Sequence, residues 1–250
     1  MKITKMTNNF IDKQTVNVST SHRFYALSQA LGAYCGADIL SFIDNNELLT
    51  ALIRKQAIKR YEMLLASNPL PQACVLLVIT DEPKPKLLLT RRSNHLSSHA
   101  GEVSLVGGKR DKTDKSSADV ALREACEEVG LNETDADILG YLPMQISQKG
   151  LLVRPVMASI SSDVMDTLMP NGDEIARLFW LPFDVLYTKP VDFVFDRPSA
   201  NSIAKLHTPA WVYDCDGSMP EIVWGLTGRI LASLMEVGFG VSHEWYYSVR

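Results

Sequence analysis

The acidic stretch Arg123-Glu124-Ala125-Cys126-Glu127-Glu128 constrains the fold more than any other part of this chain. An α-helix has about 3.6 residues per turn, so Glu124, Glu127 and Glu128 at positions i, i+3 and i+4 share one helix face. Three carboxylates so close together repel one another. The stretch therefore predicts a helix that needs a compensating positive charge.

The sequence also indicates where this helix begins and ends. Ser116 and Ser117 are candidate N-caps, and Gly130 is well placed as the left-handed residue that ends the helix. Arg123 can pair with Glu127 one turn later and hold it in place. We therefore expect a short helix over residues 117–128.

The residues before the helix favour a metal site. Gly107 and Gly108 allow backbone conformations closed to other residues, and Asp111 and Asp114 add acids in the loop that enters the helix. Mg²⁺ prefers carboxylate and water oxygens and keeps room for a substrate phosphate. The alternative is the ordinary solvated face of an amphipathic helix.

With these residues in place, the chain resembles a Nudix hydrolase. The family's box runs Gly, five residues, Glu, seven residues, then Arg-Glu, two residues, Glu-Glu, one residue and Gly, and the match starts at Gly108. Asp114 stands at the position of the first Glu, and eight residues instead of seven separate it from Arg123. This variant resembles the coenzyme A pyrophosphatase branch of the family.

A second stretch agrees with that branch. Leu88-Leu89-Thr90-Arg91-Arg92-Ser93, followed by His99 and Gly107-Gly108, is similar to the branch's Leu-Leu-Thr-x-Arg-Ser signature and its Phe-Pro-Gly-Gly turn. Leu105-Val106 replaces the usual Phe-Pro, which frees the backbone before the glycines. Glu102 replaces the usual Gln and is a candidate for a fourth acid near the site. For His99 we favour a structural or substrate-contacting role.

The resemblance implies a metal-dependent hydrolysis of a diphosphate bond. Mg²⁺ or Mn²⁺, held by Glu124, Glu127 and Glu128, would neutralise the diphosphate oxygens, and a base would orient water. Glu128, Glu127 or Glu174 could be that base, and the sequence does not choose. Together with Arg123, these are the catalytic candidates. Residues 174–182 resemble the family strand in which an acid precedes an apolar run ending in Pro.

The substrate implied by the branch is coenzyme A or a thioester of it, cleaved to 3′,5′-ADP and 4′-phosphopantetheine or its acyl form. Guanidinium and ammonium groups match phosphate oxygens, although solvent-exposed charge is the alternative for each of them. The substrate-binding candidates are Arg91, Arg92, Ser93, Gly107, Gly108 and Lys109.

Composition sets limits on partners and compartment. The chain has 250 residues, 46% of them hydrophobic, and a net charge of −4, which argues against binding nucleic acid. Four scattered cysteines without C-x-x-C spacing indicate neither zinc nor a disulfide framework. The polar N-terminus and the absence of a long apolar run favour a cytoplasmic protein without a membrane partner.

The hydrophobic pattern predicts an α/β fold in which helices cover both faces of a mixed sheet, the α/β/α sandwich that the Nudix resemblance also implies. A polar and helical N-terminal extension, residues 1–70, precedes a domain at 71–250. In the extension, apolar residues recur at helical spacing: Phe24, Leu27, Ala30 and Leu31, and later Leu48, Leu49, Leu52 and Ile53. Strands are expected at residues 73–79, 87–90, 138–145, 151–160, 175–180 and 210–213, and a closing helix at 222–236.

Three functions stay open. The chain could be a coenzyme A diphosphatase, a Nudix hydrolase of another nucleoside diphosphate such as ADP-ribose or a nucleotide sugar, or a Nudix-fold binding module without catalysis. The three repelling carboxylates of the helix speak against the last. The N-terminal region could cover the substrate pocket or form a homodimer surface, and the sequence does not decide between them.

Overall fold

The structure, a computed structural model, describes residues 24–33, 71–199, 202–217, 219–243 and 248–249. The expected polar segment 1–21 and the helical spacing of Leu48, Leu49, Leu52 and Ile53 lie outside these residues. The described chain forms an eight-stranded mixed sheet and a smaller four-stranded sheet.

The large sheet is built around two central strands that are buried on both faces. β1 (Ala73–Asp81) pairs in parallel with β7 (Leu152–Ser161) and antiparallel with β2 (Lys86–Arg92). The expected hairpin of two paired strands is therefore confirmed. The sheet is completed by β3 (Val103–Ser104), β4 (Val106–Lys109), β5 (Ala136–Tyr141), β6 (Gln145–Ile146) and β8 (Ile175–Pro182).

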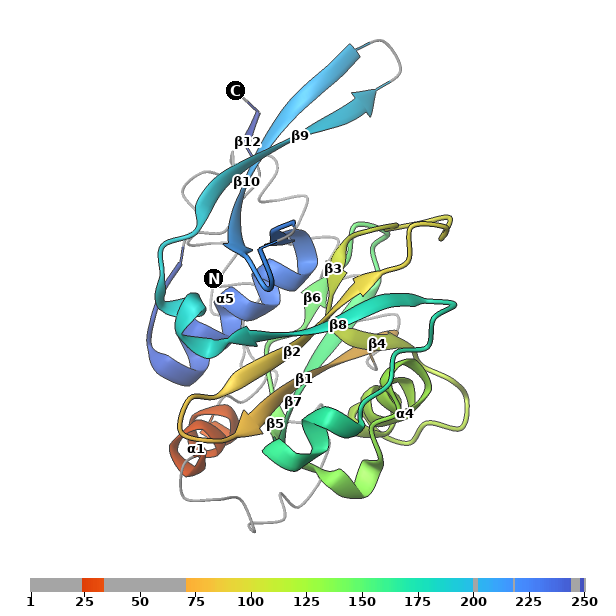
Figure 1. The fold of residues 1–250 in the computed structure, drawn as a ribbon, viewed down its shortest axis with the longest axis vertical. Coiled ribbons are helices and arrows are strands. Elements are labelled where there is room, and N and C mark those ends of the chain that lie inside the picture. The colour runs from red at the N-terminus through yellow and green to blue at the C-terminus, as the bar shows by residue number, and fades with distance from the viewer. Residues whose placement is uncertain (1–23, 34–70, 200–201, 218, 244–247, 250) are drawn as a thin grey trace, which may run out of the picture.

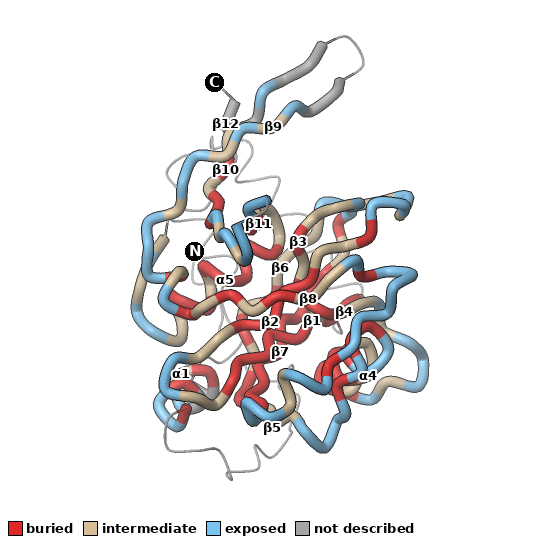
Figure 2. The backbone as a smooth tube through the Cα atoms, in the orientation of Figure 1, coloured by how far each residue is buried: buried red, intermediate tan, exposed pale blue. Residues whose placement is uncertain are grey.

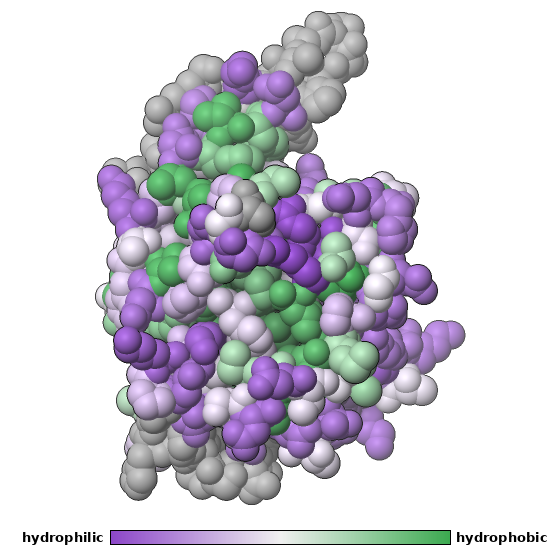
Figure 3. Space-filling view, viewed as in Figure 1, coloured by the Kyte–Doolittle hydropathy of each residue, from purple (hydrophilic) through white to green (hydrophobic). Residues whose placement is uncertain are grey.

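Helices cover this sheet on both faces, as predicted (Figure 1). α4 (Ser117–Val129) lies on one side, and α1 (Tyr25–Ala33) and α5 (Gly225–Phe239) lie on the other. Side chains of a strand alternate between its faces, so Leu76 packs in the core with α4 whereas Leu77 packs with α1 and α5. Figure 2 shows the sheet as the buried centre, and Figure 3 shows apolar residues at the middle of this view with hydrophilic residues around them.

α1 packs into the core on the α5 side of the sheet. Phe24, Leu27 and Leu31 are buried, as their helical spacing predicts. A Cβ on Gly140 of β5 would come within 2.7 Å of Leu31, and a Cβ on Gly238 would come within 2.7 Å of Leu27. Both glycines thus allow the helix to approach closely, and α1 shares a core with residues far along the chain.

The smaller sheet holds most of the departures from the prediction. β9 (Val191–Ser199) and β10 (Ser202–Tyr213) form a long antiparallel hairpin that projects beyond the large sheet (Figure 1), whereas the sequence predicted only the last residues of β10. β11 (Glu221–Val223) and β12 (Ser248–Val249) also pair with β10.

The start of the closing helix was also predicted wrongly. Residues 222–223 belong to β11, because Val212 and Trp211 of β10 pair with Ile222 and Val223, and α5 begins only at Gly225. Cross-strand pairing over a long sequence distance outweighs the local helical pattern there. Among the described residues, three short 3₁₀ helices also occur, at Glu133–Asp135, Ser162–Thr167 and Phe183–Tyr187.

The Leu105-Val106 turn is held by strand pairing instead of by proline. Val106 begins β4, is fully buried and pairs with Leu76 of β1. Leu105 is also buried, in the core on the α1 and α5 side. The backbone before the glycines is therefore fixed by a central strand, although the sequence suggested that it was freed.

Candidate active site

The acidic helix begins and ends where the sequence predicts. Ser116 is the N-cap, and its hydroxyl accepts the N–H of Asp119 at 3.1 Å while the Asp119 carboxylate accepts the N–H of Ser116 at 3.1 Å. Gly130 ends the helix in the left-handed conformation, with φ of 70°. These caps fix the length of α4 and thus the position of its carboxylates.

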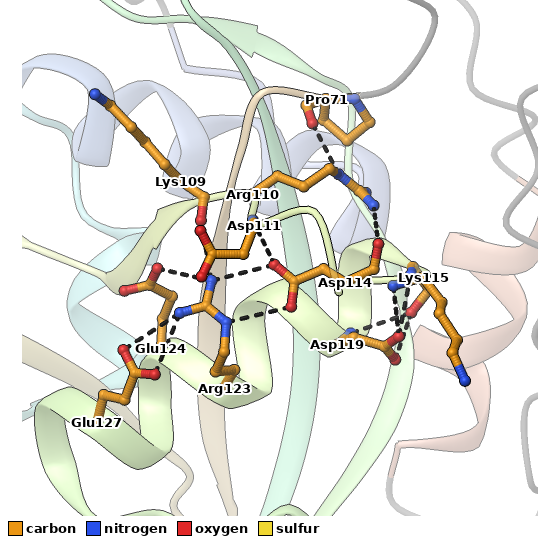
Figure 4. A network of polar contacts seen from close by, with 11 residues as sticks. Pro71, Lys109, Arg110, Asp111, Asp114, Lys115, Asp119, Arg123, Glu124 and Glu127 are labelled. Carbon is orange, nitrogen blue, oxygen red and sulfur yellow. Dashed lines mark hydrogen bonds and ion pairs between the residues drawn. The ribbon is translucent and has the colours of Figure 1, made fainter.

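Arg123 is the centre of a polar network in front of the helix (Figure 4). Its guanidinium contacts Asp114 at 3.2 Å, Glu124 at 3.0 Å and, as predicted, Glu127 at 3.2 Å. Arg123 also donates to the backbone carbonyl of Lys109 at 3.0 Å. The side chain of Lys109 points away from the carboxylates. The hydrogen bond with Asp114 raises the pKa of Arg123, so its charge is permanent. Arg123 therefore ties the entry loop to the helix.

The two glycines let the entry loop lie directly against α4. Gly107 donates its N–H to Oε2 of Glu128 at 3.0 Å, and it has a φ of 150° that side-chain-bearing residues rarely adopt. A Cβ on Gly108 would overlap the carboxylate of Glu124. Glycine at position 108 is thus required for Glu124 to rest against the loop.

Burial makes two of the helix carboxylates costly to ionise. The Glu128 residue is only 6% exposed, and this burial, with the nearby charges of Glu124 and Glu174, raises its pKa to about 7 despite the Gly107 N–H and the charge of Arg92. Burial likewise raises the pKa of Glu124, with Arg123 opposing the shift. The Glu127 side chain is 59% exposed. The site therefore concentrates negative charge that the protein compensates incompletely.

A loop before β8 brings Glu174 to this acidic cluster. Met169 donates its N–H to the carbonyl of Val129 at 3.0 Å, and Asn171 donates to that of Glu128 at 2.8 Å, so the loop docks on the end of α4. Glu174 follows in the same loop, and its charge acts on both Glu124 and Glu128. Four carboxylates from two distant segments thus meet at one place.

The end of β2 lies beside the loop that carries Glu174. Ser93 donates its N–H to the carbonyl of Glu174 at 2.9 Å, which joins β2 to the loop before β8. The positive charge of Arg92 acts on Glu128, and its Nε is buried without a hydrogen-bond partner among the described residues. Arg91 is engaged elsewhere, because Glu221 and the carbonyl of Gly101 take its donors.

His99 and Glu102 pair with each other in the turn after β2. Their side chains, Nδ1 of His99 and Oε2 of Glu102, lie 2.8 Å apart and are both partly exposed. His99 also has a positive φ of 55°. The pair thus stabilises the turn itself.

The donor set fits a divalent cation. Hard cations such as Mg²⁺ prefer carboxylate oxygens, and the loop at Gly108 leaves room for the Glu124 carboxylate. As the side chains stand, no three Asp, Glu, His or Cys residues in the described part of the chain are arranged closely enough to enclose a metal. The reason is visible in the contacts: Arg123 holds Glu124 and Glu127, and Glu128 turns to Gly107.

Two contributors to the site were not found from the sequence. The docking of residues 169–171 on α4 depends on backbone hydrogen bonds, although the turn residues Asn171-Gly172-Asp173 could have marked a tight loop. Glu221, which holds Arg91, gives no local signal at all, since its partners are far away in the sequence.

Comparison with known proteins assigns the family. The NUDIX domain model matches residues 70–201. The chain is 36% identical over 190 residues to a protein named "Uncharacterized Nudix hydrolase NudL" from Pectobacterium atrosepticum, with 74% of this chain and 94% of the relative covered. A protein of the same name from Yersinia enterocolitica is 36% identical over 166 residues, covering 66% of this chain and 80% of the relative. The chain belongs to the Nudix family.

Among solved structures, a C. elegans Ap4A hydrolase shares 18% identity at a TM-score of 0.39, covering 45% of this chain and 80% of that one. Membership of the family identifies the protein as a hydrolase that acts on phosphorus-containing anhydrides, and Nudix hydrolases generally use divalent metals. Among the described helices, none is long and apolar enough to cross a membrane.

Proposed function

We propose that this protein hydrolyses the diphosphate bond of coenzyme A or its thioesters, releasing 3′,5′-ADP and 4′-phosphopantetheine or its acyl form. The observation that carries the proposal is the Leu-Leu-Thr-Arg-Arg-Ser segment of β2, which resembles the signature of the coenzyme A pyrophosphatase branch. In the fold this segment ends at the acidic cluster, where the N–H of Ser93 bonds to the carbonyl of Glu174 and the charge of Arg92 acts on Glu128.

The acidic cluster supports a metal-dependent reaction. Glu124, Glu127 and Glu128 would hold Mg²⁺ or Mn²⁺, which when bound neutralises the diphosphate oxygens and lowers the pKa of water. Arg123 orients Glu124 and Glu127 through its contacts with both. The Gly107-Gly108 loop leaves a backbone surface that a phosphate can approach closely.

Arg92 is the best placed of the candidate phosphate ligands. Its buried Nε has a free hydrogen-bonding position among the described residues, and a guanidinium matches the oxygens of a phosphate. Arg91 would have to give up Glu221 to do the same. Ser93 lies just after the end of β2, and Lys109 ends β4 with its side chain pointing away from the carboxylates.

A carboxylate must take a proton from the attacking water. Glu128 is one candidate, since it lies in the acidic cluster and its carboxylate accepts the N–H of Gly107 at 3.0 Å. Glu127 and Glu174 are the other candidates, and Glu174 has the advantage of lying outside the helix that would hold the cation. Replacing each by Gln and comparing the pH dependence of kcat separates the three.

Product analysis tests the proposal. The purified protein is incubated with coenzyme A, ADP-ribose and a nucleotide sugar, each with Mg²⁺, with Mn²⁺ and with chelator. We expect metal-dependent release of 3′,5′-ADP from coenzyme A. Cleavage of ADP-ribose or the nucleotide sugar instead would keep Nudix chemistry and reject the branch, and cleavage of none would favour a binding module.

A further inference from the structure

A buried glutamate outside the Nudix match joins two arginines on neighbouring strands. Glu221 of β11 is only 1% exposed. Its Oε2 lies 2.7 Å from Arg91 of β2, and its Oε1 lies 2.9 Å from Nε of Arg177 of β8. Asp216 also contacts Arg177, at 3.1 Å, on the exposed side. Both oxygens of Glu221 are thus engaged by positive charge.

Without Glu221, two positive charges would lie side by side on β2 and β8. Arg91 and Arg177 are directly opposite each other in the antiparallel register of β2 and β8. Like charges in that position destabilise a sheet. The charge of Glu221, which raises the pKa of Arg177 against the effect of burial, compensates both arginines at once. A buried carboxylate held by charge-assisted hydrogen bonds gives this junction a defined geometry.

Arg91 and Arg177 lie next to an irregularity in the pairing of β2 with β8. The register of β2 and β8 shifts between Arg91 and Arg92, and Arg92 lies opposite Ile175. Irregularities of this kind re-aim the side chains that follow them. Arg92 is the residue that acts on Glu128, and Glu174 immediately precedes Ile175.

Arg91 also connects these ion pairs to the turn after β2. Its Nη1 donates to the carbonyl of Gly101 at 2.9 Å, and Gly101 donates its N–H to the carbonyl of Arg92 at 3.2 Å. Displacing Arg91 would therefore disturb both chain segments that flank Arg92.

We propose that Glu221 is a positioning residue for the hydrolytic reaction, which clamps Arg91 to Arg177 where β2 and β8 shift register and thereby fixes Arg92 at the site. The inference rests on the proposed role of Arg92 as a phosphate ligand. It also assigns a part in the reaction to residues beyond the 70–201 match.

The test is steady-state kinetics of the full chain with Mg²⁺, using whichever of coenzyme A, ADP-ribose and the nucleotide sugar the wild type cleaves fastest. The variants are Glu221→Gln, Arg92→Ala and their combination, with Asp216→Asn as the matched control that removes only the exposed partner of Arg177. Kinetic constants are corrected for the folded fraction measured by circular dichroism.

We expect Glu221→Gln to raise KM about tenfold, the size of a lost charge-assisted contact to a phosphate. The combined variant should match Arg92→Ala, because Glu221 acts through Arg92. Asp216→Asn should change KM less than about twofold, as an exposed ion pair contributes little. Loss of folded protein alone would lower kcat and leave KM unchanged.

Four outcomes overturn the inference. If Arg92→Ala leaves KM unchanged, the proposed role of Arg92 fails and the inference fails with it. If only Glu221→Gln leaves KM unchanged, or if its effect multiplies with that of Arg92→Ala, the role of Arg92 stands and the clamp is rejected. If Glu221→Gln does not fold, Arg177→Lys is used in its place, because Lys keeps the positive charge but loses the planar guanidinium that binds Glu221. An unchanged KM of Arg177→Lys also rejects the clamp.

Discussion

A glutamate is buried on each face of the large sheet, and the two carboxylates have different charges around them. On the α4 face, Glu128 accepts the N–H of Gly107 and lies near the negative charges of Glu124 and Glu174. On the opposite face, Glu221 has both oxygens bound by the guanidinium groups of Arg91 and Arg177. Both residues are less than a tenth exposed.

The difference shows that burial alone does not define the function of an acid. Glu128 lies among other carboxylates, and together they form the set of oxygen ligands that favours a divalent cation. Glu221 is neutralised by its neighbours and fixes the geometry of two strands. A buried carboxylate therefore needs to be judged by the charges around it.

The largest expected effect is on turnover. Replacing Glu127 or Glu128 by Gln keeps the size of the side chain and removes its charge. We expect kcat/KM to fall by roughly a thousandfold, or about 4 kcal/mol of transition-state stabilisation, because a cation ligand is lost. Steady-state assays at a fixed Mg²⁺ concentration measure this, with the exposed Glu236→Gln of α5 as the control.

Full activity in both variants would reject the metal site on α4. Unchanged circular dichroism spectra are required for either conclusion, because the fold should stay intact.

The α4 face could be predicted largely from the sequence because its interactions are local. Ser116, Gly130 and the Arg123–Glu127 pair are all confirmed, and each depends on residues within about one helical turn. Glu174 was found through the family pattern, although its meeting with Glu128 depends on the docking of residues 169–171 on the helix.

The opposite face could not be predicted in the same way. Glu221 and Arg91 are 130 residues apart, and no local pattern links them. β9 was missed although Val191-Asp192-Phe193-Val194-Phe195 alternates partly in the manner of a strand. Ile222 and Val223 carry a helical pattern that pairing with β10 overrides. Long-range pairing decides these elements.

A change in the core of the second face should affect stability and leave the acidic site alone. Leu31→Ala removes a buried side chain that packs against Gly140, on the α1 and α5 side of the sheet. We expect the free energy of unfolding to fall by about 3 kcal/mol because a cavity is left behind. Urea unfolding measures it, with the exposed Met219→Ala as the control.

KM for substrate should stay within about twofold of the wild type in the folded fraction of Leu31→Ala. A large increase in KM would mean that the two faces are coupled through the sheet, and the contrast drawn between them would fail.

A smaller effect is expected when the loop at the acidic site is altered. Gly108→Ala places a Cβ where the carboxylate of Glu124 now lies, so Glu124 must move. We expect the Mg²⁺ concentration for half-maximal activity to rise about thirtyfold, as when the groups that orient a metal ligand are changed. Gly172→Ala is the matched control, since a Cβ there meets no atom within 4 Å. Equal Mg²⁺ dependence in the two variants would contradict the placement of Glu124.

The smallest expected effect concerns the stability cost of Glu128 itself. Its pKa is about 7 in the folded protein and near 4.5 when unfolded, so the folded state binds more protons between these values. The contribution of Glu128 to the free energy of unfolding should therefore fall as pH rises from about 4.5 to 7, by at most about 3 kcal/mol. Glu128→Gln lacks this titration. Because its buried amide also carries a desolvation cost, we expect it to be more stable than the wild type by about 1 to 2 kcal/mol at pH 8.

Thermal and urea unfolding with chelator, at pH 4.5 and pH 8, measure this difference. The stabilisation by Glu128→Gln should appear at pH 8 and disappear at pH 4.5, where the wild-type carboxyl is protonated. Mg²⁺ at pH 8 should then stabilise the wild type more than the variant, because only a carboxylate gains from the cation. A difference that is independent of pH would show that the charge of Glu128 is compensated as fully as that of Glu221.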